Sequence, residues 1–247
     1  MESQQPAIIE EIHFTVEGIR LAGTLHLPQT VKNPPVVIGL HGLLSNRSSA
    51  KQIDLAMACN TLGIAYFRID HRGCGESEGE FESVTSLSAR VRDLLAAVET
   101  LQNRGDLGEK IGLFGSSLGG TVCLAGASRL AAVSCVTLAA PIRSRDLHNA
   151  AKAEGDSRIP ETFFNHQMQF DILEDVRQVR NLLIFHGDKD TVVPVNHARE
   201  IFRFAGEPKS LIVNREGDHR MTDPVHHKRF LTEASRWFLN AFHGTAK

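Results

Sequence analysis

The sequence has 247 residues, 42% of them hydrophobic and 23% charged, which is typical of an ordinary globular protein long enough to bury a sizeable core. Its 27 basic and 29 acidic residues give a formal net charge of −2, which excludes a strong positive field of the kind that holds nucleic acid or an anionic membrane. The polar start at 1–6 lacks the features of a secretory signal, and no run of about 18 apolar residues could cross a membrane, so we expect a cytoplasmic protein.

Two kinds of strand pattern occur along the chain. Residues 8–27 alternate apolar and polar side chains across a turn at Glu17-Gly18, which predicts an antiparallel hairpin at the edge of a sheet. Short continuous apolar runs further on are typical of parallel strands buried on both faces. These runs cover residues 36–40, 64–69, 111–114, 133–138, 182–185 and 210–213. We therefore expect eight strands, six of them parallel.

Apolar residues at helical spacing lie between these strands. They predict helices around 53–57, over 87–98, over 118–130, over 195–204 and, at the end of the chain, over 225–242. Strands and helices that alternate in this way form βαβ units. The chain is therefore predicted to have an α/β fold, with a mostly parallel sheet covered by helices on both faces.

One interval breaks this alternation. From residue 142 to about residue 179 there is no strand-like run, and Phe163, Phe164 and Phe170 lie among charged and polar residues. A loop of this length is usually functional or has structure of its own. We expect a small, partly helical cap at 142–179, inserted within a single domain of residues 1–247.

The segment G-S-S-L-G at 115–119 matches the pattern G-x-S-x-G, with Ser117 at its centre. An apolar strand ends just before it and a helical pattern begins just after it, so the serine is expected at a sharp strand-to-helix turn. Flanking glycines let the chain segments pass closely, and a helix N-terminus favours a developing oxyanion. A phosphate-binding loop has similar glycine spacing, but Thr121 stands where that loop needs lysine. Ser117 is therefore the candidate nucleophile.

A nucleophilic serine needs a base and an acid that orients the base, and after such a turn they follow in the order acid, then histidine. His219 follows the last strand and precedes the last helix, which places it at the same edge of the sheet as Ser117. The acid candidates are Asp188 and Asp190, both just past the strand at 182–185. Asp188 also fits a turn residue that hydrogen-bonds its own backbone.

The negative charge of a tetrahedral intermediate needs backbone N–H donors. The residue after the nucleophile, Leu118, supplies one, and the loop after the strand at 36–40 supplies the other. In that loop we expect Leu43 to be the donor. The neighbouring His41 fits a residue that supports the loop better than it fits a second base.

Two further patterns bear on cofactors. Residues 70–77 contain a G-x-G after a strand, but Glu78 occupies the place of the third glycine of a dinucleotide site. A structural turn, with Asp70 paired to Arg72, fits this segment better. The four cysteines are scattered singly, which fits reduced thiols, and the histidines form no spaced set. We therefore expect neither a metal nor a cofactor.

Five motifs, in this order, together resemble the α/β-hydrolase superfamily: H-G at 41–42, D-x-R-G-x-G-x-S at 70–77, G-x-S-x-G at 115–119, H-G-x-x-D-x-x-V-P at 186–194 and G-D-H at 217–219. Within it, the chain is similar to small carboxylesterases of the feruloyl- and cinnamoyl-esterase-like branch and to serine aminopeptidase-like hydrolases. The resemblance implies an α/β-hydrolase fold, with an eight-stranded, mostly parallel twisted sheet, an antiparallel N-terminal hairpin and a small inserted cap. It also implies that Asp190 is the catalytic carboxylate.

The motifs and the resemblance predict a serine carboxylesterase that cleaves small or aryl and acyl esters through an acyl-enzyme intermediate. Ser117 attacks the acyl carbon, His219 takes and returns the proton, and Asp190 orients the histidine. A single glycine after His41 disfavours bulky tertiary-alcohol esters. The predicted partner is a small-molecule ester, with neither nucleic acid nor membrane, and the chain is expected to be a monomer or a homodimer.

Several alternatives stay open. A thioesterase, a peptidase or a carbon–carbon-bond hydrolase would use the same three residues, and some proteins of this fold bind ligands without turnover. Phe163, Phe164 and Phe170 either cover the acyl or aryl group of the substrate or only anchor the cap to the body.

Overall fold

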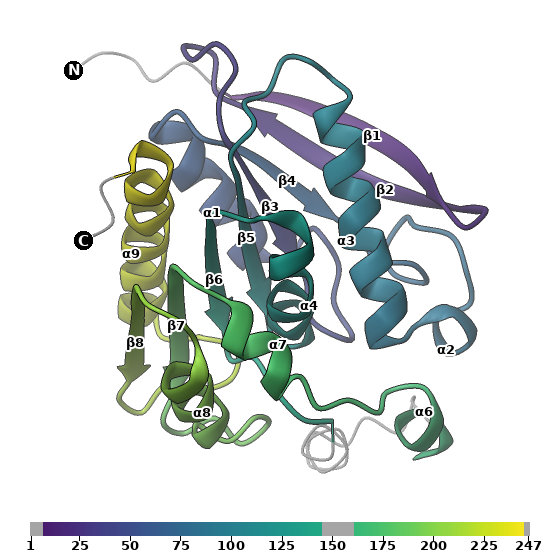
Figure 1. Cartoon of the computed structure of the whole chain (residues 1–247), viewed down its shortest axis with the longest axis vertical. Helices are drawn as coiled ribbons and strands as arrows, with labels where there is room; N and C mark the ends of the chain where they lie inside the picture. The colour runs from purple at the N-terminus through teal and green to yellow at the C-terminus, as the bar shows by residue number, and fades with distance from the viewer. Residues whose placement is uncertain (1–6, 145–160, 245–247) are drawn as a thin grey trace.

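The computed structural model describes residues 7–144 and 161–244. Its centre is an eight-stranded sheet in the order β1-β2-β4-β3-β5-β6-β7-β8 (Figure 1). The strands are β1 (Ile8–Val16), β2 (Ile19–Leu27), β3 (Val36–Leu40), β4 (Ala65–Ile69), β5 (Ile111–Ser116), β6 (Ser134–Leu138), β7 (Leu182–Gly187) and β8 (Lys209–Asn214). β1 and β2 form an antiparallel hairpin, and β2 is antiparallel to β4. The other six strands, β3 to β8, are mutually parallel. The predicted fold class is confirmed.

Helices cover both faces of this sheet (Figure 1). They are α1 (Ala50–Thr61), α2 (Phe81–Val84), α3 (Leu87–Gln102), α4 (Leu118–Gly126), the short 3-10 helix η1 (Ala127–Leu130), α6 (Glu161–His166), α7 (Leu173–Gln178), α8 (Asn196–Phe204) and α9 (Pro224–His243). The helix expected over 118–130 therefore ends as an α-helix at Gly126 and continues as a 3-10 turn. α9 begins where Asp223 caps the backbone N–H of Val225 and His226, just before a proline, and ends at Gly244 with a φ of 73°.

The core has two halves because successive side chains of a strand point to opposite faces. In β5, Leu113 packs into the half formed with α3, α4, α7 and α8, whereas its neighbour Phe114 packs into the half formed with α1 and α9. Phe114 contacts Phe230 of α9 with ring centroids 5.3 Å apart. Every residue of β3, β5, β6 and β7 is buried, as the continuous apolar runs predict.

Backbone hydrogen bonds join the two ends of the interval after β6 that breaks the alternation of strands and helices. Ser144 donates its backbone N–H to the carbonyl of Phe170 at 3.0 Å, and Ile172 donates to the carbonyl of Ile142, also at 3.0 Å. Ile142, Ile172 and Val176 are all buried in the main core. Both ends of the predicted cap at 142–179 therefore pack with the main core, and a cap between them stays a prediction. Residues 145–160 of that cap lie outside the described residues.

The parallel strands carry their following loops to one edge of the sheet. β3, β5, β7 and β8 end at Leu40, Ser116, Gly187 and Asn214, and the loops that follow these strands contain the motifs identified in the sequence. Within residues 7–144 and 161–244, no helix is both long enough and apolar enough to cross a membrane.

Candidate active site

Ser117 lies at a strained turn between β5 and α4. Its φ of 54° and ψ of −126° are unusual for a residue with a side chain, and such strain is found mostly at functional sites. A Cβ at Gly115 would lie 2.2 Å from the carbonyl carbon of Gly119, and one at Gly119 would lie 2.3 Å from the carbonyl oxygen of Leu40. Both glycines are therefore required by close backbone approach, which explains the spacing G-x-S-x-G.

The structure brings together the three side chains that the sequence singled out. His219 Nε2 lies 3.2 Å from the hydroxyl oxygen of Ser117, and His219 Nδ1 lies 2.8 Å from Asp190 Oδ2. The three residues come from the loops after β8, β5 and β7. A hydroxyl, an imidazole and a carboxylate joined in this order form the arrangement in which a base can activate a nucleophile and is itself oriented by a third group.

Asp190 is held in the orientation that this chain of hydrogen bonds needs. Its Oδ1 accepts the backbone N–H groups of Val192 and Val193 at 2.9 and 2.8 Å, which leaves Oδ2 to face His219. His186 Nε2 lies 3.3 Å from the same Oδ2. Burial alone would raise the pKa of Asp190, but the hydrogen bonds from His186, His219 and the backbone hold it well below its usual value. The carboxylate is therefore ionised across the range in which histidine titrates.

The competing aspartate has a different duty. Asp188 Oδ1 accepts the backbone N–H of Glu216 at 2.6 Å, and the backbone N–H of Asp188 donates to the carbonyl of Asn214 at 3.0 Å. These bonds join the loop after β7 to the loop that carries His219. Asp188 therefore joins two loops of the site, and among the described residues no bond from its side chain to His219 is found. The alternative interpretation expected its side chain to bond its own turn, whereas it accepts from the backbone of Glu216 on the other loop.

The two predicted oxyanion donors lie on two chain segments that meet at Ser117. Leu118 is fully buried at the first position of α4. The loop with Leu43 packs directly on the serine, because a Cβ at Gly42 would lie 3.3 Å from the Cβ of Ser117. Leu118 and the loop that carries Leu43 therefore both adjoin Ser117, and the donor role of their N–H groups stays a prediction.

A buried arginine that no motif includes fixes the direction of the Leu43 N–H. Arg90 of α3 is fully buried, and its Nη1 and Nη2 donate to the carbonyls of Gly42 and Leu43 at 3.2 and 3.0 Å. In a trans peptide, the carbonyl of Gly42 and the N–H of Leu43 point in opposite directions. By holding the carbonyl on its own side, Arg90 directs the N–H to the other side of the peptide.

His41 completes the support of this peptide. Its Nδ1 donates to the carbonyl of Gly42 at 2.7 Å, and its Nε2 accepts the backbone N–H of His71 at 3.1 Å. Burial, with the nearby His71 and Arg90, holds the pKa of His41 well below its usual value, so the ring is neutral as these two bonds require. The placement fits the supporting role expected from the sequence.

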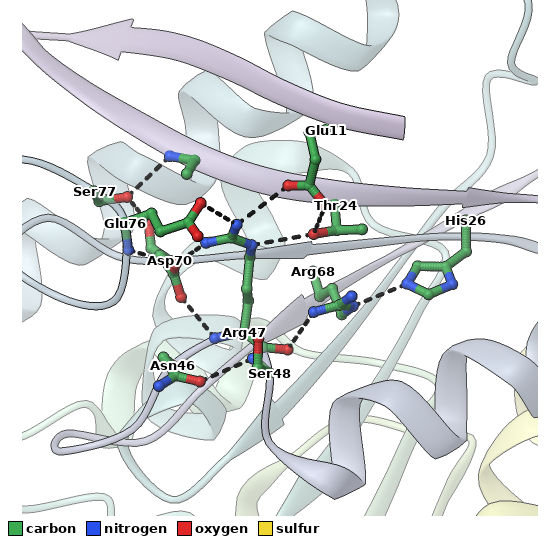
Figure 2. A network of polar contacts seen from close by, with 11 residues as sticks. Glu11, Thr24, His26, Asn46, Arg47, Ser48, Arg68, Asp70, Glu76 and Ser77 are labelled. Atoms are coloured by element: carbon green, nitrogen blue, oxygen red, sulfur yellow. Dashed lines mark hydrogen bonds and ion pairs between the residues drawn. The ribbon is translucent and has the colours of Figure 1, made fainter. Parts of the chain in front are cut away.

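The far end of the same loop is held by a second buried arginine, Arg47 (Figure 2). Its guanidinium pairs with Asp70, which follows β4, and its backbone N–H donates to Asp70 Oδ1 at 2.6 Å. The same guanidinium donates to Glu76 at 2.6 Å, to Thr24 at 3.1 Å and to Glu11 at 3.2 Å, and these contacts are drawn as dashed lines in Figure 2. Arg47 therefore ties the loop after β3 to β1, β2 and β4.

The expected pairing of Asp70 with Arg72 is wrong. Arg72 instead pairs with Asp93 of α3 at 2.7 Å and with Glu17 at 2.9 Å, while Asp70 faces Arg47. Residues two apart around this turn point to different sides, so each finds a partner that is distant in the sequence.

A cavity of about 510 Å³ opens over Ser117 and His219. It is lined by residues 41–45, 49–51, 116–117 and 219–221, with Val192 and His227. Lys51, Arg220 and His227 belong to no motif of the sequence, and they add basic groups to this lining. His227 Nε2 lies 2.8 Å from Asp54 Oδ2, so it is oriented by a carboxylate of α1.

The three phenylalanines expected to bind substrate lie behind this cavity. Phe163 and Phe164 are 3% and 4% exposed and pack with Leu118, while Phe170 is half-buried against the same group. None of the three is among the described residues that line the cavity. Contact between these rings and a substrate therefore stays a prediction.

Among residues 7–144 and 161–244, no group of three or more His, Cys, Asp and Glu side chains is arranged to hold a metal ion.

Comparisons with known proteins place the chain in a family. A model of the serine aminopeptidase family, S33, matches residues 32–164, which is more than half of the chain. The protein YfhR of Salmonella typhi, whose function is uncharacterized, is 28% identical over 229 residues, covering 87% of this chain and 75% of that protein. The mitochondrial palmitoyl-protein thioesterase ABHD10 of Mus musculus is 27% identical over 214 residues, covering 76% of this chain and 70% of that protein.

A solved structure agrees in fold. Est1E from Butyrivibrio proteoclasticus, with ferulic acid bound, superposes with a TM-score of 0.80 at 19% identity, covering 94% of this chain and 99% of that one. The eight-stranded sheet, the turn at Ser117 and the family match all agree. The chain belongs to the serine aminopeptidase family of α/β hydrolases.

Proposed function

We propose that the protein is a serine hydrolase that cleaves carboxylic esters through an acyl-enzyme intermediate on Ser117. The observation that carries this proposal is the chain of hydrogen bonds from the Ser117 hydroxyl through His219 to Asp190, which begins at a strained turn. Ser117 attacks the acyl carbon while His219 takes its proton and returns it to the leaving alcohol. Water then repeats the sequence on the acyl-enzyme, and Asp190 stabilises the imidazolium that forms in each step.

The backbone N–H groups of Leu43 and Leu118 stabilise the oxyanion of each tetrahedral intermediate. A preorganised donor of this kind contributes about 10²- to 10³-fold to turnover. Support comes from Arg90 and His41, which together occupy both lone pairs of the Gly42 carbonyl and so prevent the Leu43 peptide from rotating.

Small acyl or aryl esters suit a cavity of about 510 Å³ that opens directly over the nucleophile. Est1E, which binds ferulic acid, has the same fold, and this likeness supports an ester as the substrate. Thioesters are the second candidate, because the mouse relative is a palmitoyl-protein thioesterase. Both substrates react at an acyl carbon and need the same three residues. The four cysteines are all free and buried, which fits the reducing cytoplasm that we propose as the location.

Replacing Ser117 tests this proposal most directly. In Ser117→Ala we expect the rate of 4-nitrophenyl acetate hydrolysis to fall by at least about 10⁴-fold, because the nucleophile of an acyl-enzyme mechanism has no substitute. A fluorophosphonate should label the parent once per chain, at Ser117, because labelling requires an activated serine.

Ser116→Ala is the matched control, because Ser116 is the neighbouring hydroxyl and lines the same cavity. It should keep the label, whereas Ser117→Ala should lose it. Hydrolysis that survives in Ser117→Ala at the parent rate would refute the assignment, and a parent that neither takes the label nor turns over any ester would indicate a binding protein.

A further inference from the structure

One lysine in the cavity lacks the partner that a buried cation normally has. Lys51 lies in the first turn of α1, half-buried, and its Nζ donates to the backbone carbonyl of Arg220 at 3.1 Å. No ion pair within 4.0 Å joins it to a carboxylate of the described residues. An ammonium group has three donors, so two remain for another acceptor.

The two carboxylates whose charges act on Lys51, those of Asp218 and Asp190, are hydrogen-bonded to other groups. Asp218 accepts the backbone N–H and the hydroxyl of Thr222 at 2.9 and 2.7 Å, and Asp190 is bound to His219. Burial lowers the pKa of Lys51, and the attraction of Asp218 and Asp190 offsets this only in part. Taking an ammonium partly out of water without a full counter-charge costs free energy, so an anion that paired with Lys51 would offset this cost.

The charge of the cavity lining points in the same direction. Lys51 and Arg220 line it together with His227, which is paired with Asp54 of α1. The lining itself includes neither aspartate nor glutamate among the described residues. The whole chain carries a formal charge of −2, so the gathering of basic side chains in this lining is a local feature. Since Ser117 and His219 line the same cavity, an anion held at Lys51 would belong to the molecule that Ser117 attacks.

We propose that the cavity selects esters that carry an anionic group, a carboxylate or a phosphate, which pairs with the ammonium of Lys51. This inference rests on the proposed ester hydrolysis and names its substrate class. Lys51 acts on the non-reacting part of the substrate, and the carbonyl of Arg220 holds its ammonium at the cavity wall. Binding energy from that remote group positions the acyl carbon at Ser117.

The test compares anionic esters with neutral ones of nearly the same shape. Monomethyl glutarate and methyl 4-carbamoylbutanoate place the charge on the acyl side, and O-acetylglycolate and O-acetylglycolamide place it on the alcohol side. A third pair, 2-acetoxyethyl phosphate and its neutral dimethyl phosphate triester, separates phosphate from carboxylate. In at least one pair, kcat/KM of the parent should be at least about tenfold higher for the anion, since a charged hydrogen bond contributes this much.

Lys51→Met should reduce that ratio at least about tenfold, chiefly through KM, and Lys51→Arg should retain most of it. Lys228→Met is the matched control, because Lys228 is an exposed lysine next to His227 in the sequence and lies outside the lining. It should leave the ratio unchanged. A parent that prefers the neutral ester in all three pairs, or a ratio that Lys51→Met does not alter, would overturn the inference.

The two proposals fail in different ways. If a fluorophosphonate labels Ser117 and neutral esters are hydrolysed without any preference for anions, the substrate class is wrong and ester hydrolysis stands. If no ester is hydrolysed and Ser117 takes no label, ester hydrolysis itself is wrong.

Discussion

Two regions that meet at Leu43 are held by different forces. The loop at 41–49 is fixed by buried charged groups, since Arg47 pairs with Asp70 and Arg90 donates to two of its carbonyls. On its other side Leu43 packs on an apolar cluster, which we define as Leu118, Phe163, Phe164, Met168 and Val193. In that cluster Phe163 stacks on Phe81 with ring centroids 5.5 Å apart.

The difference matters because the two kinds of contact constrain the backbone in different ways. Hydrogen bonds from charged donors are directional, so they fix which way a peptide group points. Apolar burial is not directional and depends mainly on area and volume. We therefore expect the loop to control catalysis and to be intolerant of single substitutions. The apolar cluster should contribute stability and tolerate changes of shape.

The largest expected effect on stability comes from removing the Arg47 guanidinium. Arg47→Met leaves the carboxylate of Asp70, which is 1% exposed, without its charged partner. Losing one member of a buried pair costs about 3–5 kcal/mol. We expect the lower end of this range in urea unfolding, because Asp70 keeps the backbone N–H groups of residues 47 and 76.

An exposed ion pair of the same type provides the comparison. Arg20→Met breaks the pair of Arg20 with Glu78, whose side chains are 52% and 54% exposed, and should cost no more than about 1 kcal/mol. Equal losses in Arg47→Met and Arg20→Met would show that burial of the Arg47–Asp70 pair adds nothing, and the distinction between the two regions would fail.

Arg90 should affect turnover more than binding. In Arg90→Met the Gly42 carbonyl loses one donor and the Leu43 N–H is less firmly directed, so we expect kcat to fall about 10- to 100-fold with KM nearly unchanged. Affinity for a trifluoromethyl ketone, whose adduct carries an oxyanion, should fall in parallel. Arg90→Lys should restore part of both.

Arg92→Met is the control for this prediction, because Arg92 lies on the same helix with its side chain 43% exposed and paired with Glu17. It should leave kcat unchanged. A fall in stability of Arg90→Met with unaltered kcat and inhibitor affinity would mean that Arg90 only packs the loop.

The parts of the structure that the sequence predicted, and those that it did not, follow the same division between apolar and charged contacts. Strands were predictable where burial on both faces gives an uninterrupted apolar run, and the strand ends then placed Ser117 and His219 at one edge. Arg90 could not be identified this way, although it leaves one signal. It occupies a position on the buried stripe of α3, four residues before Leu94, where an apolar residue is expected.

Charged partners were the least predictable part. Arg47 bonds to residues 23, 29 and 36 positions away, and local sequence does not say which of several acids will be buried beside it. The predicted Asp70–Arg72 pair was wrong for this reason, because the prediction assumed that residues close in the sequence are paired in space. Lys51 has the sequence context of an ordinary surface lysine on a helix, and only the cavity distinguishes it.

The smallest effect is expected in the apolar cluster. Phe163→Leu removes part of a ring that is 3% exposed, so we expect a loss of about 1 kcal/mol in the free energy of unfolding. Because Phe163 lies behind the cavity lining, kcat/KM for both phenyl acetate and methyl acetate should stay within about twofold of the parent. Phe202→Leu, at a ring that is 37% exposed, should change stability by no more than about 0.5 kcal/mol. An increase of about tenfold in KM for phenyl acetate alone, at unchanged stability, would instead place the Phe163 ring against the substrate, which is one of the two roles that the sequence left open. The apolar region would then determine specificity rather than only support Leu43.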